Sequence, residues 1–194
     1  MKHVVIFVTG LGDNIRFLEI ATKNWSDFEV IIFSMDWCAG FEFRPKLQKL
    51  LTLIDQLSTN QNRISLVGCS AGGSATLNAF FERKGKIHKV INVCGRLRKG
   101  SQKGLRSFER KTRSSPPFAQ SVELCEGRES ILTDSDRKRI MTVKARFGDE
   151  FVPAATSTLQ GAVNIQIPSV EHLLSIWLAL TVFSKPLRTF LSSD

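Results

Sequence analysis

The stretch LVGCSAGG (residues 66–73) places one serine between two glycines, directly after an apolar run and before a segment with a helical pattern. Glycine at positions 68 and 72 would let the backbone turn sharply from a strand into a helix, with the hydroxyl of Ser70 exposed at the turn. The same pattern fits an ordinary serine in a glycine-rich bend. The role of Ser70 therefore depends on which partners the rest of the chain supplies.

Short apolar, β-branched runs alternate along the chain with helical patterns. The runs cover residues 4–8, 30–33, 64–67, 90–93, 142–147 and 163–167. The helical patterns cover residues 15–25, 44–58, 71–83, 134–140 and 172–183. Runs that are apolar along their whole length are typical of strands covered on both faces. The alternation predicts one α/β domain over residues 1–194, with a mainly parallel sheet between helices and right-handed crossovers.

The composition is that of a globular protein, with 42% hydrophobic and 23% charged residues. Four cysteines without metal or small-disulfide spacing favour a reducing, cytoplasmic setting, and no metal or nucleotide motif is visible, so we expect no cofactor. The apolar run that ends at Val8 leads into a glycine turn, which favours a strand over a signal peptide. The longest apolar stretch, residues 173–183, is too short for a transmembrane anchor.

Residues 96–141 form a long gap between the fourth and fifth expected strands. An insertion of this length in a compact domain is most often a lid, a binding loop or a mobile segment. Much of the net charge of +9 lies at its start, where one acid, Glu109, stands among eight basic residues: Arg96, Arg98, Lys99, Lys103, Arg106, Arg110, Lys111 and Arg113.

Two interpretations of this basic segment stay open. It is either a solvated loop or a cationic lid that attracts an anionic substrate or an acidic partner. We expect no nucleic-acid binding, because Phe108 is the one aromatic residue in the run and base stacking needs an interleaved set. Attraction to anionic lipid headgroups is compatible with the same charges.

A serine hydroxyl becomes an effective nucleophile only when a base removes its proton. The chain has three histidines. Ligands gather at the carboxyl ends of parallel strands, and His3 and His88 each stand at the start of an expected strand, on the opposite edge. His172 follows the sixth expected strand, on the same edge as Ser70. We therefore expect His172 to be the general base.

An imidazole base needs a carboxylate that fixes its tautomer and stabilises its cation. The turn after the fifth expected strand reads GDEFVP (residues 148–153) and offers Asp149, with Glu150 as the rival. We expect Asp149 to take this role, since a neighbouring side chain would point in another direction.

An acyl-transfer site also needs N–H donors for the oxyanion. The amide of Ala71 at the start of a helix is one candidate. The first expected strand ends in a loop where Gly10 and Gly12 free the backbone around Leu11, and the amide of Leu11 is the other candidate.

These residues together resemble the α/β-hydrolase superfamily over nearly the whole chain outside residues 96–130. The stretch 68–72 resembles its nucleophile elbow, and Ser70, Asp149 and His172 follow one another in its triad order. Residues 148–153 are similar to its acid turn. The resemblance implies a sheet order of 2-1-3-4-5-6 that lacks the superfamily's first two strands.

Residues 9–12 occupy the place of the superfamily's oxyanion loop, and residues 35–42 resemble a loop that often lines its pocket. Thr9 stands where a histidine is common, and Glu171 stands where a glycine is common. Cys69 is expected to be buried packing. The candidate substrate-pocket and lid residues are Gly10, Asp36, Trp37, Arg96 and Arg98.

The sequence thus predicts a serine hydrolase that cleaves a carboxylic ester or thioester, anionic substrates included, through an acyl-enzyme. Two alternatives stay open. The same triad serves acyltransferases, and a hydrolase-like fold could act as a binding module that uses its basic loop.

Overall fold

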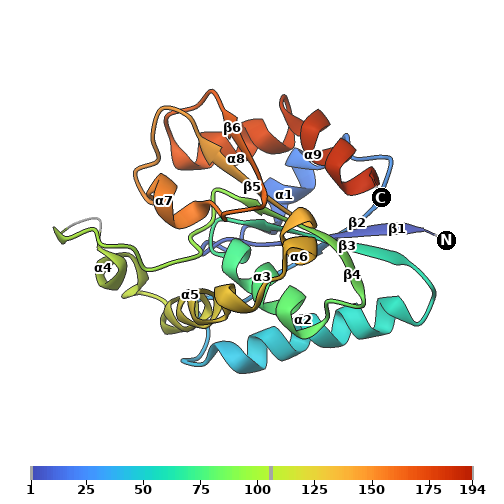
Figure 1. Ribbon diagram of the computed structural model, residues 1–194, viewed down its shortest axis with the longest axis horizontal. Helices are drawn as coiled ribbons and strands as arrows, with labels where there is room; N and C mark the ends of the chain where they lie inside the picture. Colours follow the sequence, from blue (N-terminus) through green and yellow to red (C-terminus); the bar gives the residue numbers. More distant parts are fainter. Residues whose placement is uncertain (1, 105–106, 194) are drawn as a thin grey trace.

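Parallel strands form a single sheet at the centre of the computed structural model, which describes residues 2–104 and 107–193 (Figure 1). Within these residues the strands are β1 (His3–Val8), β2 (Glu29–Phe33), β3 (Arg63–Cys69), β4 (Ile87–Val93), β5 (Ile140–Ala145) and β6 (Val163–Ile167). Their order is β2-β1-β3-β4-β5-β6, and every neighbouring pair is parallel. The predicted sheet order and all six predicted strands are confirmed, although β5 begins and ends two residues earlier than expected.

Helices cover both faces of this sheet (Figure 1). They are α1 (Ile15–Ala21), α2 (Phe43–Ser58), α3 (Gly72–Glu82), α4 (Phe108–Thr112), α5 (Pro116–Arg128), η2 (Glu129–Ile131), α6 (Asp134–Lys138), α7 (Ala154–Ser157), α8 (His172–Leu180) and α9 (Ser184–Ser192). Side chains alternate between the faces of β1 because successive residues of a strand point to opposite sides. Val4 and Ile6 join the core beneath α2, α3 and α5, whereas Val5 and Phe7 join the core beneath α1, α8 and α9.

Helix α5 lies within the insertion of residues 96–141, where the sequence analysis predicted no helix at these positions. Two prolines stand in its first turn, where the missing N–H costs nothing, and the Oγ of Ser115 accepts a hydrogen bond from the N–H of Phe118. The helix packs on α3 through a 2.8 Å hydrogen bond between the hydroxyls of Ser74 and Ser121. Much of residues 96–141 therefore belongs to the helix layer, and a lid role for the segment stays a prediction.

The helix expected over residues 172–183 ends three residues earlier, and a second helix, which the sequence did not predict, follows it. Helix α8 ends at Leu180 and α9 begins at Ser184, because Pro186 is tolerated in the first turn of a helix but would break one continuous helix. No helix in the described part of the chain combines the length and the apolar character that crossing a bilayer requires.

The two edges of the sheet differ in chemistry. His3 and His88 lie together near the amino ends of β1 and β4, with ring centroids 5.7 Å apart. The Nε2 of His3 is 2.9 Å from the hydroxyl of Ser65. The loops that follow β1, β3, β5 and β6 meet at the carboxyl edge, so this edge carries the candidate site, as expected.

Candidate active site

At the turn around Ser70, backbone segments approach one another so closely that two positions have no room for a Cβ atom. A Cβ atom on Gly68 would lie 2.3 Å from the carbonyl oxygen of Gly72, and one on Gly72 would lie 2.3 Å from that of Val8. Ser70 itself adopts φ +53°, in the left-handed region that costs energy for a residue with a side chain. Its N–H donates to the carbonyl of Val93 at 2.9 Å, which ties the turn to β4. The predicted sharp strand-to-helix turn is confirmed.

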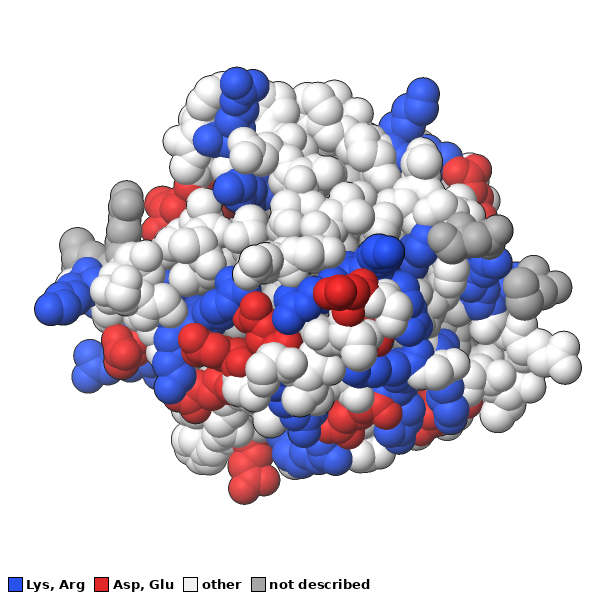
Figure 2. Space-filling model, in the orientation of Figure 1, with Lys and Arg blue, Asp and Glu red and all other residues white. Residues whose placement is uncertain are grey.

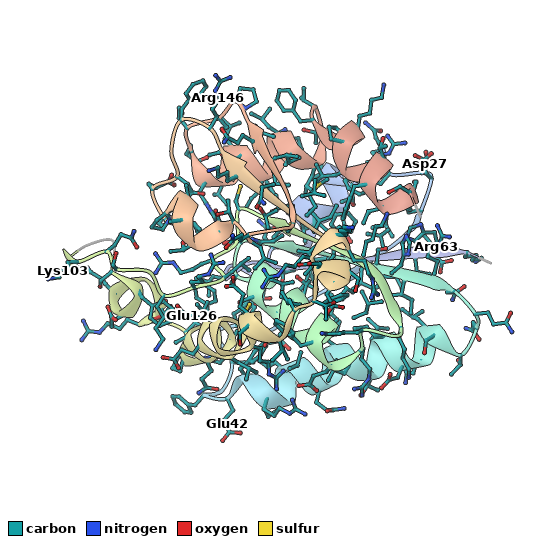
Figure 3. The ribbon with its side chains drawn as sticks, viewed as in Figure 1. Asp27, Glu42, Arg63, Lys103, Glu126 and Arg146 are labelled. Carbon is teal, nitrogen blue, oxygen red and sulfur yellow. The ribbon has the colours of Figure 1, made fainter. Side chains whose placement is uncertain are left out.

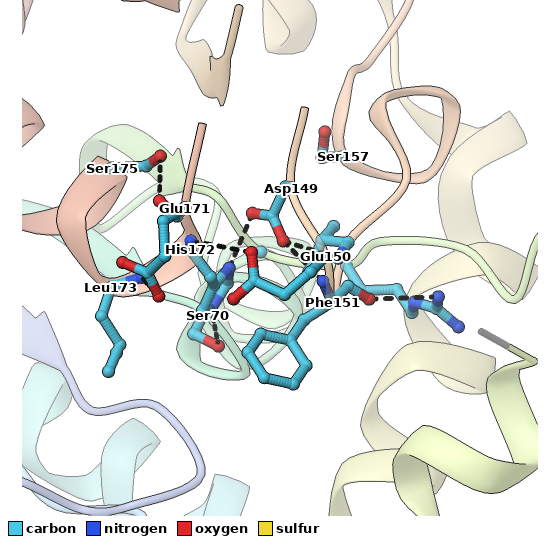
Figure 4. A network of polar contacts seen from close by, with 12 residues as sticks. Ser70, Asp149, Glu150, Phe151, Ser157, Glu171, His172, Leu173 and Ser175 are labelled. Carbon is cyan, nitrogen blue, oxygen red and sulfur yellow. Dashed lines mark hydrogen bonds and ion pairs between the residues drawn. The ribbon is translucent and has the colours of Figure 1, made fainter. Parts of the chain in front are cut away.

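Three side chains that are distant in the sequence form a continuous hydrogen-bonded chain at this turn (Figure 4). The Nε2 of His172 lies 2.8 Å from the Oγ of Ser70, and the Nδ1 lies 2.7 Å from the Oδ2 of Asp149. The side chains of His172 and Asp149 are 5% and 7% exposed. Because little water reaches the pair, their electrostatic interaction is screened less than at a surface. The structure thus brings together the three residues that the sequence selected.

The acid turn holds its carboxylate through the backbone. The Oδ1 of Asp149 accepts hydrogen bonds from the N–H groups of Phe151 and Val152, both at 2.8 Å. This leaves Oδ2 to face the imidazole. The rival Glu150 has a different partner, since its Oε2 accepts a hydrogen bond from the backbone N–H of His172 at 3.1 Å. Asp149 therefore contacts the ring of His172, whereas Glu150 contacts its main chain.

Glu171 caps the helix that begins at His172. Its carboxylate accepts hydrogen bonds from the N–H groups of Leu174 at 2.6 Å and Leu173 at 3.0 Å. These two bonds lower the pKa of Glu171 more than any other interaction does. An acid at this position therefore fits the local structure, because it satisfies two amides that the first turn of α8 leaves open.

Gly10 packs against Ser70, and the two predicted oxyanion donors, Leu11 and Ala71, directly follow these two residues in the sequence. A Cβ atom on Gly10 would lie 3.5 Å from the Oγ of Ser70. Leu11 follows Gly10 in the loop after β1, and Ala71 precedes the first residue of α3. Among the described residues, neither Leu11 nor Ala71 donates its N–H to another backbone carbonyl. Their role as oxyanion donors stays a prediction.

Asp13, which the sequence analysis did not select, joins the loops after β1 and β2. Its φ is +44°, and the adjacent Asn14 caps α1 instead. The carboxylate of Asp13 accepts hydrogen bonds from the hydroxyls of Thr9 and Ser34 and from the N–H groups of Met35, Asp36 and Trp37. It therefore fixes the loop that contains Leu11. A contact between two loops has no periodic signature in a sequence, so no signal there could have identified it.

The indole of Trp37 is fully buried, stacks on Phe43 and donates to the carbonyl of Thr9 at 2.9 Å. The expectation that Trp37 lines a substrate pocket is wrong, because its ring supports the loop from beneath. Asp36 is exposed at φ +53°, and its carbonyl accepts a hydrogen bond from the ammonium of Lys46. Its assignment to the pocket stays a prediction.

Several positive charges of the basic segment are paired with carboxylates or buried in the structure, so they do not form one exposed cationic surface. Arg98 forms a bidentate ion pair with Glu129, and Lys99 pairs with Glu123. Arg96 is buried, so it cannot present its charge on the surface of a lid. Lys103 extends from the body of the molecule (Figure 3), and Arg106 lies outside the described residues. On the face in Figure 2, blue and red residues intermingle over the lower half.

Five exposed apolar side chains belong to the segments that carry Asp149 and His172, and we call them the apolar rim: Phe147, Phe151, Val170, Leu173 and Leu174. The Phe151 ring meets the His172 ring edge-on, with centroids 5.4 Å apart. In the view of Figure 4 the side chains of Phe151 and Leu173 lie on either side of the Ser70 hydroxyl. An apolar rim of this kind favours binding of an apolar group next to the hydroxyl.

A cavity of about 200 Å³ borders Asp149. Its lining residues include Cys94 and Ser157, which are buried, and Lys144, which is partly buried. Within the described residues, no group of three His, Cys, Asp or Glu side chains could hold a metal ion. Burial raises the pKa of the Cys69 thiol to about 12, so Cys69 is a packing residue as expected, with little thiolate at neutral pH.

No protein-family model and no curated protein sequence matches the chain. Solved structures do share its fold. A lipase-esterase related protein from Clostridium acetobutylicum is 14% identical, with a TM-score of 0.68 over 97% of this chain and 94% of its own. The enol-lactonase from Burkholderia xenovorans is 14% identical, with a TM-score of 0.67 over 100% and 92%. A hydrolase from Oleispira antarctica is 10% identical, with a TM-score of 0.66 over 100% and 92%. At these identities the likeness establishes the fold.

Proposed function

We propose that this chain, which has the α/β-hydrolase fold, is a serine hydrolase that cleaves a carboxylic ester or thioester through an acyl-enzyme. The observation that carries the proposal is the hydrogen-bonded chain Ser70–His172–Asp149 at the carboxyl edge of the sheet. The imidazole of His172 lies within hydrogen-bond reach of the nucleophile on one side and of the acid on the other, which is the geometry that activates a serine.

In the first half of the reaction, the Oγ of Ser70 attacks the acyl carbonyl while its proton passes to the Nε2 of His172. Asp149 stabilises the imidazolium that forms, and the N–H groups of Leu11 and Ala71 donate to the oxyanion. The tetrahedral intermediate then collapses. The alcohol or thiol leaves with the proton from His172, and the acyl group stays on Ser70.

In the second half, His172 removes a proton from a water molecule, which attacks the acyl-enzyme. The second tetrahedral intermediate expels the Oγ of Ser70, which recovers its proton from His172, and the carboxylic acid is released. The apolar rim supports a substrate with an apolar acyl or alcohol group beside the reacting carbonyl. Four free thiols support function in a reducing compartment such as the cytoplasm.

A panel of p-nitrophenyl esters and acyl thioesters with graded chain lengths tests this proposal. We expect wild-type protein to hydrolyse members of the panel, and the variant Ser70→Ala to lose at least about 1,000-fold in kcat/KM while it keeps its circular dichroism spectrum. Folded wild-type protein without turnover on any member, or an equally active Ser70→Ala variant, would refute the proposal.

A further inference from the structure

Arg96 is a buried cation whose partners in the described part of the chain are neutral. Its side chain is among the largest that are fully buried. The guanidinium donates to the carbonyl of Lys99 at 3.3 Å and to the carbonyl of Phe151 at 3.5 Å, and it faces the ring of Phe108 at 5.8 Å. No ion pair joins Arg96 to a carboxylate of the described residues, in contrast to Arg98.

A buried charge without a close counterion is costly, and hydrogen bonds at these lengths recover little of the cost. Burial accordingly lowers the pKa of Arg96, while the negative charges of Glu109 and Asp149 act in the opposite direction. An apolar side chain would fill the same volume without the penalty. The energetics therefore point away from stability as the reason for an arginine here.

The backbone around Arg96 connects the serine turn to the segment after β5. A Cβ atom on the preceding Gly95 would lie 2.4 Å from the carbonyl oxygen of Ser70, so this residue is wedged against the turn. The N–H of Leu97 donates to the carbonyl of Thr156 at 2.7 Å. Arg96 thus projects from a backbone that is fixed at both the nucleophile and the acid side of the site.

The contact at Phe151 is the informative one. Phe151 belongs to the same acid turn as Asp149. The N–H of Phe151 donates a hydrogen bond to the Oδ1 of Asp149, and the carbonyl of Phe151 accepts a hydrogen bond from Arg96. Figure 4 shows both bonds at Phe151. The carbonyl of Phe151 lies in the same rigid peptide plane as the N–H of Val152, which donates to the same Oδ1 of Asp149 at 2.8 Å. The hydrogen bond from Arg96 therefore holds the direction of that N–H group and, through it, the orientation of the carboxylate.

We propose that Arg96 is a positioning residue that holds the acid turn so that Asp149 faces His172. This inference rests on the proposed function for its kinetic consequence, but its structural content is independent of it. Arg96 acts through Asp149 and touches no substrate. Its effect on the reaction should accordingly disappear when Asp149 can no longer orient the imidazole.

A double-mutant cycle tests this role, with Arg96→Met, Asp149→Asn and the combined variant assayed on one p-nitrophenyl ester. Arg139→Met is the matched control. Arg139 is a partly buried arginine near the end of residues 96–141, directly before β5. Like Arg96, it donates hydrogen bonds to backbone carbonyls, which are those of Lys84, Ile87 and His88. Arg96→Lys keeps the charge but lacks the two-pronged donor, and it replaces Arg96→Met if the latter does not fold.

We expect Arg96→Met to lower kcat by roughly 10- to 100-fold with KM changed less than about threefold, since a small misplacement of a catalytic group has this effect. In the Asp149→Asn background the same substitution should change kcat by less than about twofold. Arg96→Lys should recover part of the loss. Arg139→Met should lower the Tm yet keep kcat within about twofold of wild type. Equal losses from Arg96→Met in both backgrounds would overturn the inference.

A readout without substrate separates this inference from the proposed function. The proton on Nδ1 of His172, hydrogen-bonded to Asp149, should give a downfield NMR resonance that Asp149→Asn removes. We expect Arg96→Met to shift or broaden this resonance and Arg139→Met to leave it unchanged. If wild-type protein shows the resonance but hydrolyses no ester, the proposed function fails while the positioning role is still measured. An unaltered resonance in Arg96→Met would overturn the positioning role.

Discussion

The backbone of Gly10 lies so close to Ser70 that a Cβ atom at position 10 would be 2.9 Å from the Cβ of the serine. Real Cβ contacts are almost never this short, so a larger residue at position 10 would displace either the serine turn or the loop after β1. The nucleophile and the loop with the proposed oxyanion donor Leu11 are therefore positioned against each other.

The substitution Gly10→Ala should consequently lower kcat by roughly 10- to 100-fold through displacement of the hydroxyl or of the Leu11 amide. Gly12→Ala is the matched control in the same loop, because a Cβ there would meet no atom within 4 Å. Steady-state ester hydrolysis by both variants checks this expectation. Similar kinetics for the two would show that the contact between Gly10 and Ser70 is unimportant.

The two neighbouring acids of the acid turn should differ in effect. Asp149→Asn removes the charge that stabilises the His172 cation and should lower kcat by about 1,000- to 10,000-fold. Glu150→Gln keeps an acceptor for the backbone N–H of His172 and should cost about tenfold or less. Comparison of kcat for the two variants decides between the two acids. A larger loss for Glu150→Gln than for Asp149→Asn would show that Glu150, and not Asp149, is the acid that supports His172.

The conformation of Ser70 should be visible in stability. Its φ of +53° is unfavourable for any residue with a Cβ, whereas glycine adopts it readily. Ser70→Gly should therefore be more stable than Ser70→Ala by about 1 kcal/mol in urea unfolding. Both variants lack the hydroxyl, so the comparison isolates the backbone. A Ser70→Gly variant less stable than Ser70→Ala would argue against strain at this turn.

His3 should make stability depend on pH. Burial above all, and then the positive charges of His88, Arg63 and Lys89, lower the pKa of His3 from 6.5 to about 4. Because the unfolded chain binds a proton at this histidine at a higher pH than the folded chain, stability is full above about pH 6.5 and falls as the pH drops toward 4.

Thermal unfolding of wild type and His3→Gln between pH 7 and pH 5 measures this contribution. We expect the Tm of the variant to fall less steeply over this interval, although His88, whose pKa is also lowered, still titrates in both proteins. Parallel pH profiles would show that His3 contributes nothing to the dependence.

The sheet and most of the candidate site could be predicted because both follow from local patterns. Apolar runs identify the strands of a buried parallel sheet, and the carboxyl edge then selects His172 over His3 and His88 without knowledge of any contact. The resemblance to α/β hydrolases supplied the strand order. The geometry around Gly68 and Gly72 explains why the turn needs those two residues.

The rest depends on contacts between distant segments. Asp13 belongs to no motif, and in the structure its carboxylate joins the loops after β1 and β2. Trp37 was placed in a pocket, yet Thr9 and Phe43 bury it. Helix α5 lies in a charged segment that contains prolines and was not predicted, because its own apolar pattern is weak. Its packing on α3 contributes more to its stability. None of these pairings leaves a repeat in the sequence.

Covalent labelling of intact protein with a fluorophosphonate, followed by mass spectrometry of its peptides, tests most directly whether Ser70 is an activated nucleophile. We expect a single phosphonyl adduct on the peptide that contains Ser70, none on Ser70→Ala, and much slower labelling of the variant His172→Ala. Folded wild-type protein that takes up no label, or takes it up on a different residue, would contradict the account.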